Sequence, residues 1–220
     1  MLEQLIFGSD YNKDWHMLPG ERAALLFLLQ LYKPQVSIEI GTFRGGSLRP
    51  ISALSEKVYT FDIDASQHRM APLNVEFVTG DTANTLDPVV SSLNDSGDEV
   101  NFILIDGSHE ERGVLLDVNS CLKYKPKKRP CVIVMHDSWN PAVRSGIMAA
   151  NWGDCVHAHG LDLDFVPGIL QSRPDIAGQI WGGLAVALLL PEVRTAPFQL
   201  QSYYGHSRNI LMSHSVHKPA

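Results

Sequence analysis

The chain has 220 residues, of which 45% are hydrophobic and 19% are charged, the usual composition of one compact domain with a sizeable core. This composition excludes disorder, collagen and coiled coil as overall descriptions. The formal net charge of -6 argues against a protein that grips nucleic acid through its phosphates. Three scattered cysteines match no zinc pattern, and we expect them to be reduced thiols in the cytoplasm.

The sequence also gives no sign of a membrane segment or a secretory signal. Its longest apolar runs fall well short of the roughly 18 residues that a membrane span requires. A signal peptide has a basic start followed by an apolar block, and residues 1–10 lack this layout. We therefore expect a cytoplasmic protein without a membrane partner.

The first predicted element is a helix at residues 19–33, where apolar side chains recur at helical spacing before Pro34. Short apolar runs then alternate with segments of helical character. The runs predict strands at residues 36–40, 58–61, 75–78, 100–105 and 131–135. The segments between and after them predict helices at residues 47–55, 66–70, 83–93, 110–122 and 142–151. This alternation is typical of an α/β, doubly wound, mostly parallel sheet with helices on both faces.

Two further strands are predicted at residues 161–166 and 183–190, which gives a seven-stranded Rossmann-like sheet. We expect a single domain over residues 1–198, with the first helix as an N-terminal extension. Residues 199–220 are polar and rich in Ser, Gln and His. They are expected to be a tail that is mobile or packs on a partner subunit, and the formation of a homo-oligomer stays open.

Acidic residues follow the predicted strands. Glu39, Asp62, Asp106 and Asp137 lie at the ends of the first, second, fourth and fifth strands, and Asp81 follows the third. The carboxyl ends of parallel strands share one edge of the sheet, where doubly wound folds bind their ligands. One such acid is commonly a helix cap, but this series around a glycine loop predicts a binding crevice.

The glycine loop follows the first strand, within the sequence from Glu39 to Ser47. Gly41 permits a tight turn, and Gly45 lets the backbone approach a ligand while the next helix begins near Ser47. Asp62 lies 21 residues after Gly41, close to the spacing of about 20 at which an acid receives ribose hydroxyls in such folds. The pattern predicts a nucleotide-type cradle, although it departs from the dinucleotide pattern G-x-G-x-x-G.

These pieces, together with Gly80-Asp81-Thr82, Asp106-Gly-Ser-His109 and His136-Asp137, resemble the class I S-adenosylmethionine-dependent methyltransferases. The chain is most similar to the small bacterial O-methyltransferases of methyltransferase family 24. This group includes cephalosporin hydroxylase-like and macrocin O-methyltransferase-like proteins. The resemblance covers about residues 35 to 150.

The resemblance implies S-adenosyl-L-methionine as the methyl donor and assigns residues to each of its parts. The residues that would border its methionine and ribose are Glu39, Gly41, Thr42, Gly45 and Ser47. The ribose hydroxyls would bind Asp62, with Asp64 as a weaker candidate, and the adenine would lie between Asp81 and Thr82. Asp106 would face the transferable methyl group, and His109 would line the cofactor or order its loop.

The catalytic candidates are therefore Asp106, His136 and His109. Relatives of catechol type hold a divalent cation at the ends of two neighbouring strands, which here carry Asp106 and Asp137. With His136 these residues form a candidate ligand set for Mg²⁺ or Mn²⁺, and the imidazole would favour Mn²⁺, Fe²⁺ or Zn²⁺. The sequence permits this cation without requiring it. In the alternative, His136 is a general base that accepts the hydroxyl proton.

The sequence thus predicts a methyltransferase that methylates a hydroxyl of a small molecule, such as a sugar or natural product. Two alternatives remain open. An NAD-dependent Rossmann oxidoreductase would explain the glycine loop and Asp62, and an inactive nucleotide-binding protein of the same fold would explain the unusual His136. Trp139, Trp152 and Trp181 fall where such enzymes build acceptor pockets, so one of them could stack on a ring, although core packing is the simpler interpretation.

Overall fold

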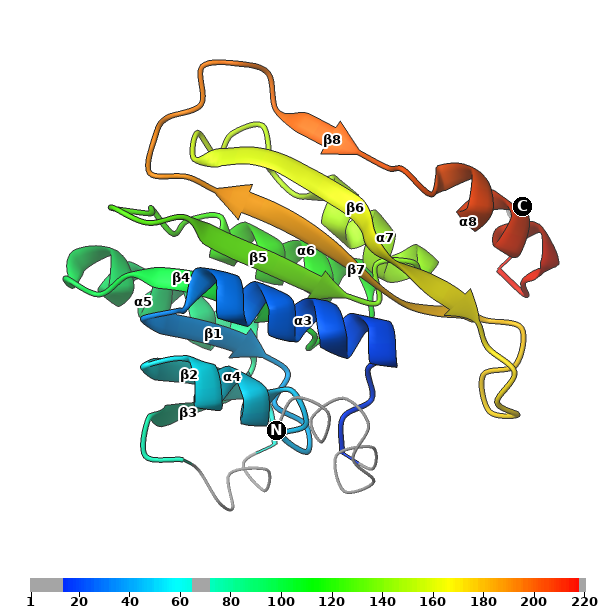
Figure 1. The fold of residues 1–220 in the computed structure, drawn as a ribbon, viewed down its shortest axis with the longest axis horizontal. Coiled ribbons are helices and arrows are strands. Elements are labelled where there is room, and N and C mark those ends of the chain that lie inside the picture. Colours follow the sequence, from blue (N-terminus) through cyan, green and yellow to red (C-terminus); the bar gives the residue numbers. More distant parts are fainter. Residues whose placement is uncertain (1–13, 65–71, 218–220) are drawn as a thin grey trace.

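The computed structural model of the protein describes residues 14–64 and 72–217, which form one eight-stranded sheet with helices on both faces (Figure 1). The strand order is β3-β2-β1-β4-β5-β7-β6-β8. The strands are β1 (Val36–Ile40), β2 (Lys57–Asp62), β3 (Val75–Thr79), β4 (Val100–Ile105), β5 (Cys131–His136), β6 (Ala158–Leu170), β7 (Ile180–Leu189) and β8 (Gln199–Gln201). The predicted Rossmann-like fold is confirmed, with eight strands in place of seven.

The direction of the strands defines the edge at which a ligand would bind. Five strands run parallel in the order β3-β2-β1-β4-β5, whereas β7 is antiparallel to both of its neighbours, β5 and β6. The chain builds outward from β1 in one direction through β2 and β3, and from β4 in the other. The strand order therefore reverses between β1 and β4, and doubly wound folds bind ligands outside the carboxyl ends of the two strands at this point.

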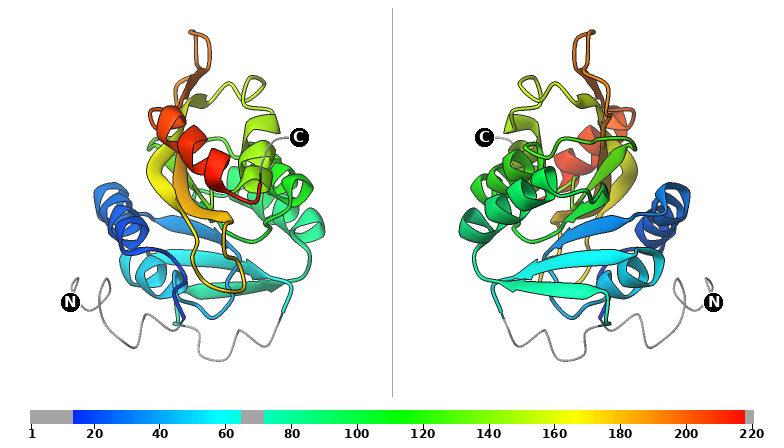
Figure 2. Two further views of the ribbon diagram at one scale, coloured as in Figure 1. Left: turned by 90° about the vertical axis from the view of Figure 1, so that its right-hand side faces the viewer. Right: turned by 90° about the vertical axis from the view of Figure 1, so that its left-hand side faces the viewer.

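Two helical layers cover the sheet (Figure 2). Helices α3 (Pro19–Tyr32) and α4 (Leu48–Leu54) pack on one face. Helices α5 (Thr82–Asp95), α6 (Glu111–Cys121) and α7 (Pro141–Ala149) pack on the other. Strand β4 divides its buried side chains between the two layers, since Phe102 joins the first cluster and Ile103 the second. Burial on both faces explains why this strand is an almost unbroken apolar run in the sequence.

Local capping determines where several helices begin and end. The Asp81 carboxylate accepts a hydrogen bond from the backbone N–H of Ala83 at the start of α5. The Asn140 side chain accepts one from Ala142, and Pro141 occupies the first position of α7. None of the described helices combines the length and the apolar composition that a bilayer crossing requires. Capping thus holds Asp81, one of the expected acidic residues, in the short connection between β3 and α5.

The structure differs from the sequence prediction mainly in its last third. Strand β6 begins before and ends after the predicted residues 161–166, because it forms a long antiparallel ribbon with β7. The segment after residue 198 contains β8, which pairs with β6, and α8 (Gly205–His214). Neither element was predicted, since α8 buries none of its residues and β8 is exposed throughout. The helix predicted at residues 66–70 lies outside the described residues.

Candidate functional site

A cavity of about 440 Å³ lies beside the carboxyl ends of β1, β4 and β5. It brings together eight of the predicted site residues from separate turns of the chain. These are Gly41, Thr42, Ser47, Asp62, Asp106, His109, His136 and Asp137. The expected convergence of strand-end acids is therefore present in the structure for Asp62, Asp106 and Asp137.

The glycine loop forms the floor of this cavity at the point where the strand order reverses. Gly41 has a φ of +93°, and a Cβ there would lie 2.3 Å from the backbone oxygen of Asp106. A Cβ at Gly46 would likewise lie 2.4 Å from the backbone oxygen of Asp14 and 2.4 Å from the Cα of Trp15. Two strand ends and the N-terminal segment therefore approach each other at positions that admit no side chain.

Glu39 lies behind the loop and lines neither the larger cavity nor the smaller one described below. Its fully buried carboxyl accepts hydrogen bonds from the hydroxyls of Ser47 and Thr60, both at 2.6 Å. Burial raises the pKa of Glu39 to about 8, although these hydrogen bonds act in the opposite direction. Glu39 therefore supports the loop from inside the protein, although we expected it to border the cofactor. Gly45, which we also expected to border the cofactor, likewise lines neither cavity.

Replacing Glu39 by glutamine is expected to change how stability depends on pH. The pKa of Glu39 is raised in the folded state, so between about pH 5 and pH 8 the unfolded chain ionises first and the native protein loses stability as pH rises. The loss for one group is at most about 1.4 kcal/mol per pH unit. Glutamine cannot ionise, so urea unfolding should show the variant gaining stability relative to the native protein across this range. The same substitution at the exposed Glu56 is the control. If the free energy of unfolding depended on pH in the same way for Glu39→Gln and for the native protein, the prediction would be contradicted.

Asp62 lies at the end of β2 and borders both cavities. One carboxylate oxygen accepts a hydrogen bond of 2.7 Å from the backbone N–H of Phe43, and the other accepts one of 2.9 Å from Asp64. Phe43 has a φ of +44°, a conformation that costs a non-glycine residue about 1–3 kcal/mol. The contact with Asp62 holds the glycine loop in this shape, and each carboxylate oxygen retains capacity to accept a further hydrogen bond.

A second cavity of about 240 Å³ adjoins the first and shares Gly41, Asp62 and Gly107 with it. Its lining includes Asp81 and Thr82, the two residues assigned to the adenine. The Thr82 hydroxyl donates a hydrogen bond of 2.6 Å to the buried carboxyl of Asp117, and burial raises the pKa of that carboxyl to about 6. The two cavities therefore meet at Gly41, Gly107 and Asp62 and together form the candidate site.

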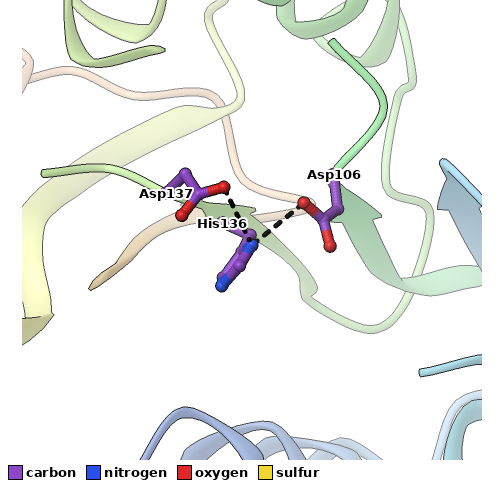
Figure 3. Close-up of side chains that lie close together, drawn as sticks. All are labelled: Asp106, His136 and Asp137. Carbon is purple, nitrogen blue, oxygen red and sulfur yellow. Dashed lines mark hydrogen bonds and ion pairs between the residues drawn. The ribbon is translucent and has the colours of Figure 1, made fainter. Parts of the chain in front are cut away.

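The ends of β4 and β5 carry a cluster of Asp106, His136 and Asp137 (Figure 3). One donor atom from each residue lies within 4.8 Å of the others. His136 Nδ1 is 2.9 Å from Asp106 Oδ1 and 3.4 Å from Asp137 Oδ2. Asp137 has a φ of +56°, and its other oxygen accepts a hydrogen bond of 2.6 Å from the Gly182 N–H. The backbone conformation and this bond from β7 turn the Asp137 carboxylate toward His136.

The sequence analysis missed one member of this group, Glu21. It comes from the first turn of α3, is fully buried and contacts His136 Nε2 through Oε2 at 3.2 Å. Its Oε2 also accepts a hydrogen bond from the Leu18 N–H, and its Oε1 accepts one of 2.6 Å from the Gly183 N–H. An acid three residues after the N-cap residue of a helix is an ordinary capping signal, so no local pattern connects Glu21 with a residue 115 positions away.

Carboxylates outnumber cationic side chains in the cluster. Burial lowers the pKa of His136, but the charges of Asp106 and Asp137 outweigh this effect and raise the pKa well above 6.5. A hydrogen bond to Asp137 raises the pKa of His109, whose Nε2 lies 3.1 Å from Asp137 Oδ2. Burial opposes ionisation of Asp137, yet the neighbouring His136 keeps the pKa of Asp137 below its usual value. Three carboxylates against two imidazoles leave this group attractive to a cation.

The remaining walls come from two segments that carry no recognised motif. Trp15, Met17 and Leu18 precede α3, and the buried Arg22 donates hydrogen bonds to the carbonyl oxygens of Trp15 and Met17. The connection between β6 and β7 supplies a second wall with Gln171, Arg173 and Ile176, and Trp181 near the start of β7 completes it. The Trp181 ring makes an edge contact with the ring of His109, with centroids 5.3 Å apart.

Of the three tryptophans considered, only Trp181 lines the larger cavity. Trp139 and Trp152 are buried, with exposures of 1% and 5%. Trp152 stacks on Phe198 in the core, with ring centroids 5.7 Å apart. Packing therefore explains two of these residues, and one is available to contact a ligand.

Comparison with known proteins finds a family model and several solved structures that this chain resembles. Residues 38–138 match the model of a family described as a methyltransferase domain. The structure resembles an O-methyltransferase from Bacillus cereus in complex with SAH, with a TM-score of 0.55 and 16% identity over 86% of this chain and 90% of that chain. It also resembles TomG from Streptomyces achromogenes, an O-methyltransferase involved in tomaymycin synthesis, with a TM-score of 0.55 and 14% identity over 87% and 89% of the two chains.

A third similar structure is that of the N-methyltransferase NodS from Bradyrhizobium japonicum, with a TM-score of 0.52 and 12% identity over 87% of this chain and 97% of that chain. The curated proteins contain no match. The resemblance drawn from the motifs is confirmed, and the family match falls within the expected residues 35 to 150. Because similar folds serve both oxygen and nitrogen acceptors, the fold alone does not determine the acceptor.

Proposed function

Residues 38–138 form a methyltransferase domain of the class I fold, and from that premise we propose that the protein transfers a methyl group from S-adenosylmethionine to a hydroxyl of a small molecule. The observation that carries this proposal is the single cavity in which the glycine loop, Asp62 and the Asp106–His136–Asp137 cluster meet. A donor molecule and an acceptor oxygen would both find their binding groups there. We further propose that the protein acts in the cytoplasm, with no nucleic acid partner.

The two joined cavities suit an adenosyl sulfonium compound, because the groups that would bind its adenine, ribose and methionine parts follow one another from the smaller cavity to the larger one. Asp62 lies where they meet and has capacity to accept hydrogen bonds from the ribose hydroxyls. Asp81 and Thr82 would flank the adenine in the smaller cavity, while Thr42 and Ser47 would border the methionine part in the larger one. Gly41 lines both cavities, and its lack of a side chain lets the Asp106 backbone approach the glycine loop where they meet. The cofactor, when bound, supplies an electrophilic sulfonium methyl group.

The donor atoms of Asp106, His136 and Asp137 also fit a divalent cation. Two carboxylates and one imidazole are ordinary ligands of Mn²⁺, Fe²⁺ or Zn²⁺, and the surplus of acidic groups around them favours positive charge. A bound cation would supply Lewis-acid activation of the acceptor hydroxyl. The alternative role of His136 as a general base is less well supported, because both of its ring nitrogens face carboxylates.

The chain's own residues would contribute mainly by alignment and exclusion of water. Trp181, Ile176 and the segment around Trp15 enclose the acceptor side of the cavity. Asp106 would stabilise positive charge near the reacting atoms. His109 has 46% of its side chain exposed and contacts Asp137, so it is the group that would pass the hydroxyl proton from the cluster to solvent.

Calorimetry and a transfer assay together test this proposal. The protein should bind S-adenosylhomocysteine and not NAD⁺, and it should transfer a labelled methyl group to at least one member of a panel of sugars, catechols and hydroxylated aromatic compounds. Binding of NAD⁺ in place of S-adenosylhomocysteine would support the oxidoreductase alternative. Binding of S-adenosylhomocysteine without transfer to any acceptor, with Mn²⁺ or after chelation, would support an inactive nucleotide-binding protein.

Replacing Asp62 by alanine is expected to weaken S-adenosylhomocysteine binding by about 1–3 kcal/mol, because ribose hydroxyls and the Phe43 N–H would lose their acceptor. Isothermal calorimetry at fixed pH measures the difference. Asp64→Ala is the matched control, since Asp64 lies outside both cavities and is the weaker candidate for the same role. Equal losses for the two variants, or an unchanged affinity for Asp62→Ala, would refute the ribose assignment.

A further inference from the structure

The His136 ring is held between carboxylates at both of its nitrogens. Nδ1 faces Asp106 Oδ1 and Asp137 Oδ2, the two other donor atoms of the candidate cation site. Nε2 points in the opposite direction and faces Glu21 Oε2 at 3.2 Å. The ring therefore separates the cation site from Glu21, which takes no part in that site's donor set.

The hydrogen-bond partners of Glu21 determine how it can interact with the ring. Its Oε1 accepts from the Gly183 N–H at 2.6 Å and its Oε2 accepts from the Leu18 N–H at 2.5 Å. These backbone groups can only donate, so both carboxylate oxygens are fixed as acceptors and the side chain cannot turn away. His136 Nε2 must then present a hydrogen to Glu21. The ring nitrogen left for a cation is Nδ1, where the cation would replace the proton that Nδ1 shares with Asp106 Oδ1.

We propose that Glu21 is the positioning residue of a carboxylate–histidine–cation arrangement, holding His136 with Nδ1 directed toward a cation shared with Asp106 and Asp137. The proposal rests on the cation site of the proposed function. Histidine ligands commonly donate their second N–H to such a carboxylate, which fixes the ring and strengthens the ligand. Because an imidazole nitrogen is the ligand being strengthened, Glu21 should favour Mn²⁺, Co²⁺ or Zn²⁺ over Mg²⁺.

A purely structural role is the competing explanation. Glu21 also connects α3 to β7 through the Gly183 N–H, so its removal will disturb packing whether or not a cation binds. The two roles differ in their dependence on residue 136. A structural loss would be the same whatever residue stands there, whereas the positioning effect needs an imidazole N–H. A double-mutant cycle between the two positions separates these explanations.

The cycle uses Glu21→Met, His136→Asp and the double variant of the full chain, with Co²⁺ affinity measured by calorimetry in the absence of cofactor. Methionine keeps a similar volume and removes the carboxylate. Glu21→Met should lower Co²⁺ affinity about 10–100-fold in the native background. In the His136→Asp background the same change should leave affinity unchanged or raise it, because the introduced carboxylate has no hydrogen to donate and is repelled by Glu21.

Thermal unfolding of the cation-free variants and the visible absorption of bound Co²⁺ accompany the titrations, so that a loss of fold is separated from a loss of ligand geometry. If Glu21→Met does not fold, Glu21→Gln replaces it in the cycle, with a smaller expected loss in the same direction. Equal losses in both backgrounds, no loss in the native background, or no Co²⁺ binding by the native protein would overturn the proposal.

S-adenosylhomocysteine binding by the same preparations distinguishes failure of this proposal from failure of the proposed function. A native protein that binds S-adenosylhomocysteine and transfers methyl groups equally well after chelation would retain the function and lose the role of Glu21. A native protein whose cation affinity depends on Glu21, but which does not bind S-adenosylhomocysteine, would retain the role of Glu21 and lose the proposed function.

Discussion

Replacing Gly41 by alanine is expected to destabilise the protein by about 3 kcal/mol or more and to reduce S-adenosylhomocysteine affinity at least tenfold. Gly41 has a φ of +93°, which is strained for any residue with a Cβ. The new methyl group would lie 2.3 Å from the Asp106 backbone oxygen and 2.9 Å from the Gly107 Cα. Relief of this overlap requires the ends of β1 and β4 to separate, and both the cavity floor and Asp106 would move. Urea unfolding and calorimetry measure the two effects.

Gly97→Ala is the matched control for this substitution. A Cβ at Gly97 would meet nothing within 4 Å, so its effect on unfolding should stay within about 0.5 kcal/mol and cofactor affinity should not change. If Gly41→Ala were as mild as Gly97→Ala, the close approach of β1 and β4 would not be a feature of the protein in solution. A stable Gly41→Ala variant with unchanged affinity would also remove the glycine loop from the proposed donor site.

Replacing Asp106 by alanine is expected to lower kcat/KM for methyl transfer about 10³-fold, the upper range for loss of one charged group that stabilises a reacting centre. Asp106 directly follows β4, lines the larger cavity and contacts His136 Nδ1 at 2.9 Å. The substitution would remove one of three candidate cation ligands and a negative charge beside the position proposed for the methyl group. The measurement is methyl transfer to whichever acceptor the native protein uses, over a series of Mn²⁺ concentrations.

Thermal unfolding should show that Asp106→Ala remains folded, because 22% of the Asp106 side chain is exposed and it belongs to neither core cluster. Asp95→Ala, at the exposed end of α5, is the control and should retain full activity. Activity within tenfold of the native protein for Asp106→Ala would contradict both the proposed cation site and the proposed position of the methyl group.

The central sheet could be predicted from sequence because its strands are buried on both faces. Strand β4 is apolar at five of its six positions and is buried throughout, so its pattern cannot be produced by an amphipathic surface helix. The C-terminal elements carry no such signal. The three residues of β8 are exposed, and α8 buries nothing, so the position of β8 depends on pairing with β6 and not on an apolar pattern.

The same contrast holds for the candidate site. Asp62, Asp106 and Asp137 could be found because each lies at or directly after the end of a strand, and the carboxyl ends of parallel strands meet at one edge. Glu21, Trp15 and Ile176 reach the site through the packing of α3 and of the β6–β7 ribbon, which no local pattern specifies. Glu39 belongs to the recognised motif, but its side chain points into the core and bonds to Ser47 and Thr60. A motif position thus identified a loop correctly without identifying the atoms that face the cavity.

The ribbon of β6 and β7 extends past the rest of the sheet, and the turn between its strands supplies one wall of the cavity (Figure 1). Gln171, Arg173 and Ile176 lie in this turn, in a different part of the chain from the glycine loop and from Asp81. Mutations that lengthen, shorten or exchange the turn can accumulate without disturbing the groups assigned to the methyl donor. Evolution, or a protein engineer grafting turns from relatives, could therefore retarget such a protein to new acceptors by varying a single hairpin tip.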